Sequence, residues 1–344
     1  MSVIKKILLF FPSLLYFLIT KIRNRLFDFH LLKSKSFPNP QTIVIGNLAM
    51  GGTGKSPAVS FLLKNWIWNK KVAVLSRGYG RKTKGFHWAN SLSSSMQLGD
   101  EPMAYHLMFP HIPLAVGEDR VRAIEQMKKD LPDLSCIILD DAFQHRSLKP
   151  TLSIVCTTFQ DPFFDDHVFP MGRLREARTG IKRADAVIVT RCPDQLSVEK
   201  KTRFRKRIHS YAKDDISVFF TGIQYEQAIG HDLGLIKQWH LVAGIANPEL
   251  FFEKAMSLGS ILSQKTYADH HHFSHEELTQ MNSLALNMPE HEAFLTTHKD
   301  FVRFQDHFQK YPHLKSKLYY LPMEMYFSDG NQGFWSWLGM KLGR

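Results

Sequence analysis

The stretch GNLAMGGTGKSP, residues 46–57, constrains the fold more than any other part of the chain. The β-branched run TIVIGN precedes it and the apolar segment SPAVSFLLKNWIW follows it, which predicts a strand, a glycine-rich turn and a helix in that order. In such a turn, backbone N–H groups converge on phosphate oxygens, and the helix N-terminus adds positive potential. The stretch therefore predicts a nucleotide-binding P-loop.

The predicted loop comprises Ala49, Met50, Gly51, Gly52, Thr53, Gly54, Lys55 and Ser56. Lys55 is expected to contact the β- and γ-phosphates, and Ser56 to ligate Mg²⁺. Ala49 stands where the usual spacing has glycine, but it begins the turn, whereas the phosphate-facing positions remain glycine. The alternative, a glycine-rich turn with a merely exposed lysine, is disfavoured because the strand–turn–helix context is the one that the motif requires.

Short β-branched runs alternate with helical patterns between residues 42 and 191. The clearest helix pattern covers 119–129, and this alternation predicts a mostly parallel α/β sheet with helices on both faces. Candidate strands are residues 42–45, 72–76, 112–116, 136–139, 152–156 and 186–190.

The chain is long enough for more than one domain, with 344 residues. A basic segment, KKTRFRKRIHSYAK, interrupts the alternation, which then resumes. We expect an N-terminal helix over 1–30, a P-loop domain over 31–215 and a smaller C-terminal α/β domain over 216–344.

The N-terminal segment carries an apolar stretch over 7–19 that is too short to span a bilayer and is interrupted by Pro12. No small-residue cleavage site follows it, as a signal peptide would require. Two alternatives remain, namely a helix lying in the membrane interface and a helix packed on the protein's own core. The interfacial helix is favoured, because lysines and arginines flank the stretch and would face anionic headgroups: Lys5, Lys6, Lys21, Arg23 and Arg25.

Composition agrees with an anionic partner. The chain has 44 Lys and Arg against 32 Asp and Glu, which gives a formal net charge of +12. Such a charge attracts nucleic acid, phosphorylated metabolites or an anionic leaflet, and it does not indicate which of these is the partner. The cysteines, Cys136, Cys156 and Cys192, are widely spaced in apolar runs and are expected to be buried free thiols, which favours a reducing cytoplasmic compartment.

Two acidic pairs are candidate metal and catalytic groups. Asp140 and Asp141 follow the apolar run 137–139, where a P-loop enzyme places a magnesium-binding carboxylate. Adjacent residues of a strand point to opposite sides, so we expect at most one of them to contact the metal directly. Asp100 and Glu101 precede a predicted helix, where the alternative role is a helix cap with a first-turn acid.

The segment YADHHHFSHEEL places histidines before a helix that Ser274 and Glu277 are expected to cap. Consecutive histidines cannot all converge on one metal ion. His270, at the predicted strand–helix junction, is a candidate to relay a proton or orient a carboxylate, and a solvated loop cluster is the alternative.

Several ordered motifs together resemble the tetraacyldisaccharide 4'-kinase (lipid A 4'-kinase) family, over most of the chain: GNLAMGGTGKSP, LSRGYGRK, LGDEP, VGEDRVRA, ILDDAFQHR, FPMGRLREA, GIANPELFF, DHHHFS and TTHKD. The resemblance implies a P-loop domain, a smaller C-terminal domain and a β linker between them. It also implies transfer of the ATP γ-phosphate to the 4'-hydroxyl of a tetraacyldisaccharide 1-phosphate, giving lipid IVA. The enzyme would use ATP and Mg²⁺ and act on an acylated disaccharide lipid at the cytoplasmic face of the inner membrane.

The resemblance also assigns roles to residues. Asp100 would take the proton of the sugar hydroxyl while His270 orients or polarises it. Glu101, Asp140 and Asp141 would serve metal and loop positioning. Four arginines are candidates to hold phosphates, with a surface ion pair as the alternative for each: Arg77, Arg120, Arg122 and Arg173.

TTHKD departs from the family's usual Thr-Glu-Lys-Asp, with His298 at the acidic position, so the role of residues 296–300 stays open. The chief alternative function is a P-loop GTPase resembling a metallochaperone, in which Lys-Asp would contact a guanine base. The cysteines do not form the metal motif that such a protein needs. A non-enzymatic nucleic-acid or membrane adaptor that merely binds nucleotide is disfavoured, because the acidic pairs would repel a polyanion unless a metal intervened.

Overall fold

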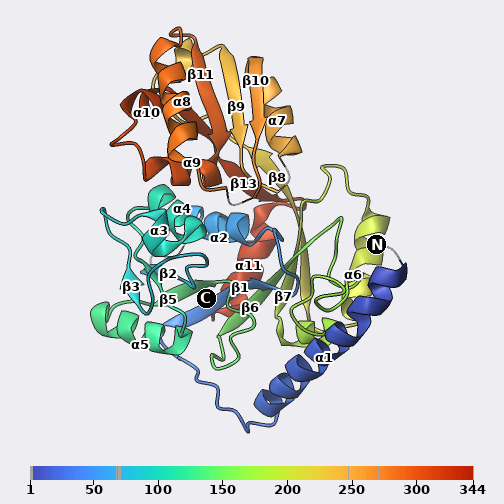
Figure 1. Cartoon of the computed structure of the whole chain (residues 1–344). Coiled ribbons are helices and arrows are strands. Elements are labelled where there is room, and N and C mark those ends of the chain that lie inside the picture. The colour runs from blue at the N-terminus through green and yellow to red at the C-terminus, as the bar shows by residue number, and fades with distance from the viewer. Residues whose placement is uncertain (1–2, 67, 69–70, 247, 270, 344) are drawn as a thin grey trace.

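The computed structural model describes residues 3–66, 68, 71–246, 248–269 and 271–343. Two sheets organise these residues, one nine-stranded in the order β13-β8-β7-β6-β1-β5-β2-β4-β3 and one four-stranded in the order β10-β9-β11-β12. The sheets lie in two lobes that meet near α9 and α4 (Figure 1). The fold is therefore α/β, as expected.

The large sheet is parallel except at its two ends, where β3 pairs with β4 and β13 pairs with β8 in antiparallel fashion. The central strands β2, β5, β6 and β7 are buried at every position, as parallel strands covered on both faces must be. The strands are β1 (Gln41–Asn47), β2 (Val72–Ser76), β3 (His87–Trp88), β4 (Leu114–Val116), β5 (Cys136–Asp140), β6 (Leu152–Thr158), β7 (Ala186–Thr190), β8 (Ser217–Tyr225) and β13 (Met323–Phe327). All six candidate strands are confirmed within a few residues.

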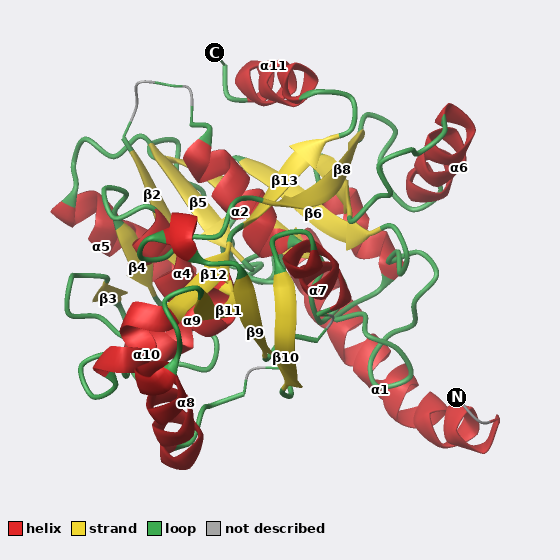
Figure 2. Ribbon diagram, turned by 90° about the horizontal axis from the view of Figure 1, so that it is seen from above, coloured by secondary structure: helices red, strands yellow, loops and turns green. Residues whose placement is uncertain are grey.

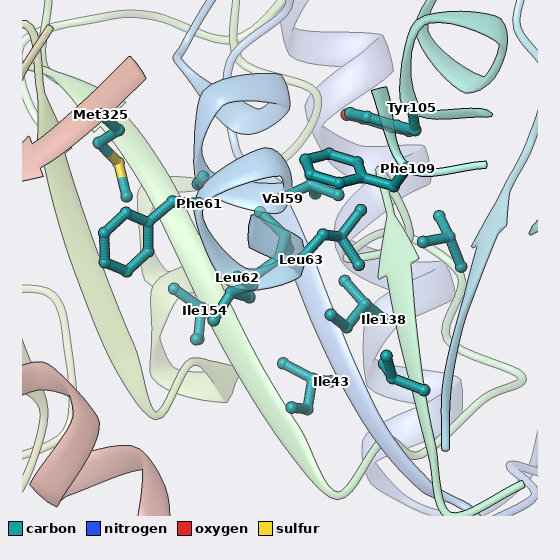
Figure 3. Packing of buried hydrophobic residues seen from close by; sticks show 14 of the residues in the cluster. Ile43, Val59, Phe61, Leu62, Leu63, Tyr105, Phe109, Ile138, Ile154 and Met325 are labelled. Carbon is teal, nitrogen blue, oxygen red and sulfur yellow. The ribbon is translucent and has the colours of Figure 1, made fainter. Parts of the chain in front are cut away.

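Helices cover both faces of this sheet (Figure 2). One core cluster lies under α2, α4 and α11, and a second lies under α5 and α6. Figure 3 shows α2 of the first cluster, whose Leu62 packs toward Ile43 and Ile154 of the sheet. The helices are α2 (Lys55–Lys64), α3 (Ser95–Leu98), α4 (Asp100–Met108), α5 (Arg120–Asp130), α6 (Val198–His209) and α11 (Asn331–Lys341), with a 3₁₀ turn at Arg178–Arg183.

The small sheet is parallel throughout and carries its own core. Ser274 caps α8 and Glu277 completes the expected capping box. The elements are β9 (Gln238–Ala243), β10 (Ser260–Thr266), β11 (Glu292–Thr297), β12 (Leu318–Leu321), α7 (Glu249–Met256), α8 (His275–Asn287), α9 (His298–Gln305) and α10 (Pro312–Lys317), with a 3₁₀ turn at Leu233–Leu235.

The chain passes between the lobes on the antiparallel pair β8 and β13, which forms an edge of the large sheet. After β13, α11 returns to the core of the large lobe. Strands β8 and β13 join the large sheet and α11 packs in the first core cluster, although all three lie within 216–344, the range expected to hold the smaller domain and its β linker. The difference arises because sequence order does not show which sheet a strand joins.

Helix α1 (Val3–Asp28) runs along the outside of the large lobe (Figure 1). Its polar side chains bond to the body: Ser13 Oγ donates to Val168 O at 2.7 Å, and Asn24 Nδ2 donates to Glu176 Oε2 at 2.7 Å. The other side presents an exposed apolar row of Leu8, Phe10, Phe11, Leu14, Leu15, Leu18, Ile19 and Ile22. Within the described ranges, no helix has both the length and the apolar character that a bilayer span requires.

Candidate active site

The predicted P-loop connects β1 to α2. Gly54, in the left-handed conformation with φ 83°, precedes the first helical residue, Lys55. Two buried hydrogen bonds hold the turn: Asn47 Nδ2 donates to Thr53 Oγ1 at 2.8 Å, and Thr190 Oγ1 donates to Thr53 O at 2.9 Å. Strands β1 and β7, which lie on either side of β6, thus fix the turn against the N-terminus of α2.

The loop has one crowded and one open side. A Cβ at Gly54 would lie 2.8 Å from side-chain atoms of Thr190, whereas a Cβ at Gly51, where φ is 97°, would meet nothing within 4 Å. Ala49 is buried and forms a β-bridge with Leu174. Ala49 therefore belongs to the packed base of the turn, which explains why glycine is not needed there.

Asp140 and Asp141 lie beside the loop at the end of β5. Asp140 is the last strand residue, and Asp141 leaves the strand with φ 51°. Asp141 Oδ1 lies 3.6 Å from Lys55 Nζ and accepts from Arg175 NH1 at 2.9 Å. The chain thus bends at Asp141, so the alternation expected of adjacent strand residues does not apply there.

Asp140 is buried among both acidic and basic side chains. Burial and the charge of Asp141 raise the pKa of its carboxyl to about 7, and Glu101 adds to that shift. Burial and the charge of Asp140 also raise the pKa of Tyr105, which lies close to Ser56. Asp140 Oδ1 is buried with no hydrogen-bond partner among the described residues. An unbonded buried carboxylate oxygen, on a residue that shares the neighbour Tyr105 with Ser56, suits a hard divalent cation with oxygen ligands.

The first turn of α4 carries the other acidic pair, Asp100 and Glu101. Both carboxylates bond to α9 of the small lobe: Arg303 NH2 lies 2.7 Å from Asp100 Oδ2, and Lys299 Nζ lies 2.9 Å from Glu101 Oε1. The candidate acidic residues therefore lie where the two lobes meet. His270, the expected partner of Asp100, lies outside the described residues.

The four candidate arginines divide into two pairs. Arg120 is buried and donates to Asp141 O at 3.2 Å, and burial together with the charge of Arg77 lowers its pKa to about 10. Arg77 and Arg120 therefore lie close to one another, and Arg120 contacts Asp141 beside the P-loop.

The other two arginines lie on the surface. The side chain of Arg122 is 87% exposed and pairs with Asp119. Arg173 binds Asp166 through Nε at 3.0 Å, with Asp161 at 3.4 Å. Both form the surface ion pairs that were the alternative for each arginine.

Residues 296–300 support the site from the small lobe. Asp300 is fully buried and bonds to Thr297 Oγ1, to Gly244 N and to Arg303. His298 packs against Tyr320, with ring centroids 4.9 Å apart, and burial lowers its pKa to about 4. The Lys-Asp pair therefore makes internal contacts, with Lys299 bonded to Glu101 and Asp300 to its own lobe.

Sequence reasoning missed three residues of the site, Tyr105, Arg175 and Arg303. Arg175 lies within the motif FPMGRLREA, but nothing local distinguishes it from Arg173. Tyr105 follows Glu101 by one helical turn, and that spacing places it on the same helix face. Arg303 is far from Asp100 in sequence, so only the tertiary fold brings the two together.

Comparison with known proteins agrees with this geometry. The family model of the tetraacyldisaccharide-1-P 4'-kinases matches residues 5–342. A tetraacyldisaccharide 4'-kinase of Flavobacterium johnsoniae is 40% identical, covering 97% of this chain and 96% of its own. That of Flavobacterium psychrophilum is 38% identical, with 94% and 93% covered.

A solved structure extends the comparison to the fold. LpxK of Aquifex aeolicus, crystallised in complex with ATP, superposes with a TM-score of 0.73 at 25% identity, covering 96% of this chain and 97% of its own. The resemblance that the motifs carried thus extends over the whole fold. The chain belongs to the tetraacyldisaccharide-1-P 4'-kinase family.

Proposed function

We propose that the protein transfers the γ-phosphate of ATP to the 4'-hydroxyl of a tetraacyldisaccharide 1-phosphate, giving lipid IVA. The observation that carries the proposal is the meeting of the P-loop lysine with acidic residues from two elements. Asp141 lies 3.6 Å from Lys55, and the charges of both Asp141 and Glu101 act on Asp140. Phosphoryl transfer needs this combination, because its catalysis rests on positioning and on charge stabilisation.

ATP would bind along Ala49–Ser56, with the backbone N–H groups of the loop and Lys55 holding the phosphates. Mg²⁺ would be held by Ser56 and Asp140, whose Oδ1 has no other partner among the described residues. Asp141 and Glu101 would complete the acidic surroundings. When bound, the cation supplies neutralisation of the charge on the transferred phosphoryl group.

The acceptor hydroxyl would lie near Asp100, at the junction of the lobes. A carboxylate there can accept the proton that the sugar oxygen loses as it attacks phosphorus. In this proposal His270 orients or polarises Asp100. Arg77 and Arg120 are the better candidates for phosphate contacts, since Arg122 and Arg173 are engaged in surface ion pairs.

The acyl chains of the proposed substrate give a reason for the exposed apolar row of α1. A helix that bonds to the body through polar side chains and exposes an apolar row is the inverse of a helix packed on a core. We propose that this row enters the cytoplasmic leaflet of the inner membrane, so that the protein binds the membrane peripherally and reaches a substrate anchored there. The interfacial alternative is favoured over the packed helix, because the large apolar side chains point outward.

The proposal is tested with purified protein, Mg²⁺-ATP labelled at the γ-position and the tetraacyldisaccharide 1-phosphate in detergent micelles. Labelled lipid is expected from ATP and much less from GTP. Asp100→Ala is expected to depress kcat far more than it weakens ATP binding. The kinase proposal is wrong if no labelled lipid forms while GTP hydrolysis proceeds, which is the outcome expected of the GTPase alternative.

A further inference from the structure

Among the described residues, polar side chains of α9 and of Asp306, which follows it, contact α3 and α4 of the opposite lobe, and α9 lies beside α4 in both views (Figures 1 and 2). Arg303 contacts Asp100, and Lys299 contacts Glu101. At the end of α9, Asp306 accepts from Ser95 N at 3.1 Å and from Ser95 Oγ at 2.7 Å. One short helix therefore bridges the lobes at the residue proposed to receive the proton.

The contact with Asp100 is the most enclosed of the three. Arg303 directs Nε at 2.8 Å and NH2 at 2.7 Å to the same oxygen, Asp100 Oδ2. The side chain of Arg303 is 3% exposed and that of Asp100 is 13% exposed. A planar guanidinium holding one oxygen by two N–H groups fixes the position of that oxygen far better than a flexible ammonium would.

Arg303 is itself held on the side of the small lobe. Its NH1 donates to Asp300 Oδ1 at 2.8 Å and to Gly244 O at 3.3 Å. The other oxygen of Asp300 accepts from Gly244 N at 2.9 Å and from Thr297 Oγ1 at 2.7 Å. These bonds tie the guanidinium to the ends of β9 and β11, so that the small lobe also holds it in position.

We propose that Arg303 is a positioning residue for phosphoryl transfer, which fixes the Asp100 carboxylate relative to the P-loop and makes its geometry depend on the arrangement of the lobes. This inference rests on the proposed function of Asp100. Arg303 acts through Asp100 and takes no part in binding ATP. Because a misplacement of about 1 Å can cost about 100-fold in rate, removal of Arg303 should lower kcat rather than raise KM.

The first experiment compares three variants in the lipid kinase assay, with KM for ATP and kcat measured separately. Arg303→Ala is expected to lower kcat by about 100-fold with KM for ATP changed by less than about threefold. Arg303→Lys keeps the charge without the planar fork and should recover part of that loss. Asp306→Ala removes another contact of α9 across the same junction and should leave kcat within about twofold of the wild type.

The second experiment places Arg303→Ala in an Asp100→Asn background. If Arg303 acts through Asp100, the second substitution should lower kcat by less than about threefold, because the two residues act as a unit. The proposal is overturned if Arg303→Ala lowers kcat as much in the Asp100→Asn background as in the wild type. It is also overturned if the Arg303→Ala enzyme has wild-type kcat. If Arg303→Ala does not fold, Arg303→Lys decides, and an unaltered kcat in that variant refutes the positioning role.

These outcomes differ from those that refute the proposed function. A wild-type enzyme that labels no lipid contradicts the kinase proposal itself. An active wild type whose Asp100→Ala variant is impaired, but whose Arg303 variants are normal, contradicts only the positioning role.

Discussion

Gly54 has both a left-handed backbone and a crowded Cβ position, so the free-energy cost of Gly54→Ala follows from the structure. Its φ is 83°, and a Cβ there would lie 2.8 Å from Cγ2 and Oγ1 of Thr190. Alanine in the left-handed conformation costs about 1–2 kcal/mol. Overpacking adds about 1–3 kcal/mol, because carbon atoms normally stay about 3.5–4.0 Å apart.

Relaxation of this clash would disturb the nucleotide site directly. Thr190 is buried and donates the hydrogen bond that holds Thr53 O. Moving either partner weakens a bond worth about 1 kcal/mol and loosens Thr53, which lies two residues before Lys55. Gly54→Ala is therefore expected to cost between about 2 and 5 kcal/mol in total, divided between the free energy of unfolding and the geometry of the loop.

The assay measures KM for ATP and kcat in the lipid kinase reaction, together with the melting temperature with and without Mg²⁺-ATP. We expect at least about a 100-fold loss in kcat/KM and a reduced stabilisation by nucleotide. Gly330→Ala is the matched control, since Gly330 precedes α11 with φ 82° and has open space around its Cβ position. It should lower the melting temperature without changing the kinetics. Wild-type kcat/KM in Gly54→Ala, with the control destabilised as expected, would refute the assignment of the loop.

Three further predictions concern the exposed apolar row of α1, the thiols and Asp141. Phe11→Glu with Leu15→Glu changes side chains that are 71% and 61% exposed. Binding to anionic vesicles should weaken by at least about 100-fold in a flotation assay, since burying each side chain is worth about 1.5–3 kcal/mol. Leu92→Glu, at a position 89% exposed outside α1, should not weaken this binding. Burial raises the thiol pKa of Cys156 to about 12 and of Cys192 to about 11, so the thiolate is scarce at pH 8. Alkylation of both cysteines should therefore be slow until denaturant is added. Rapid labelling of the native protein would contradict this burial. Asp141→Asn removes the charge facing Lys55 and Arg175. The Mg²⁺ concentration for half-maximal activity should rise by about 10–100-fold. An unchanged Mg²⁺ dependence would count against the proposed role of Asp141.

Local signals in the sequence predicted the large lobe well. Strands β2 and β7 begin and end where their β-branched runs do, and α5 at Arg120–Asp130 lies within one residue of the expected range 119–129. The three cysteines are buried and free, as expected. These successes share a cause, because hydrophobic periodicity and turn residues act within a few positions along the chain.

Pairing across long sequence separations could not be predicted in this way. The sequence indicated a boundary at 216, and it could not show that β8, just after this position, pairs with β7 of the large sheet, or that α11 packs in the first core. Among the arginines, only burial separates Arg120 from Arg122, because both lie in the first turn of α5.

The P-loop could be located from local sequence, because its strand, glycines, lysine and helix are contiguous along the chain. Local motifs also marked Asp100 and Asp140 as candidates. The contacts that these groups make could be found only from the folded chain. The bend at Asp141 toward Lys55 and the contact of Arg303 with Asp100 across the lobes arise from packing between distant segments, whose energies depend on which surfaces meet and not on local sequence.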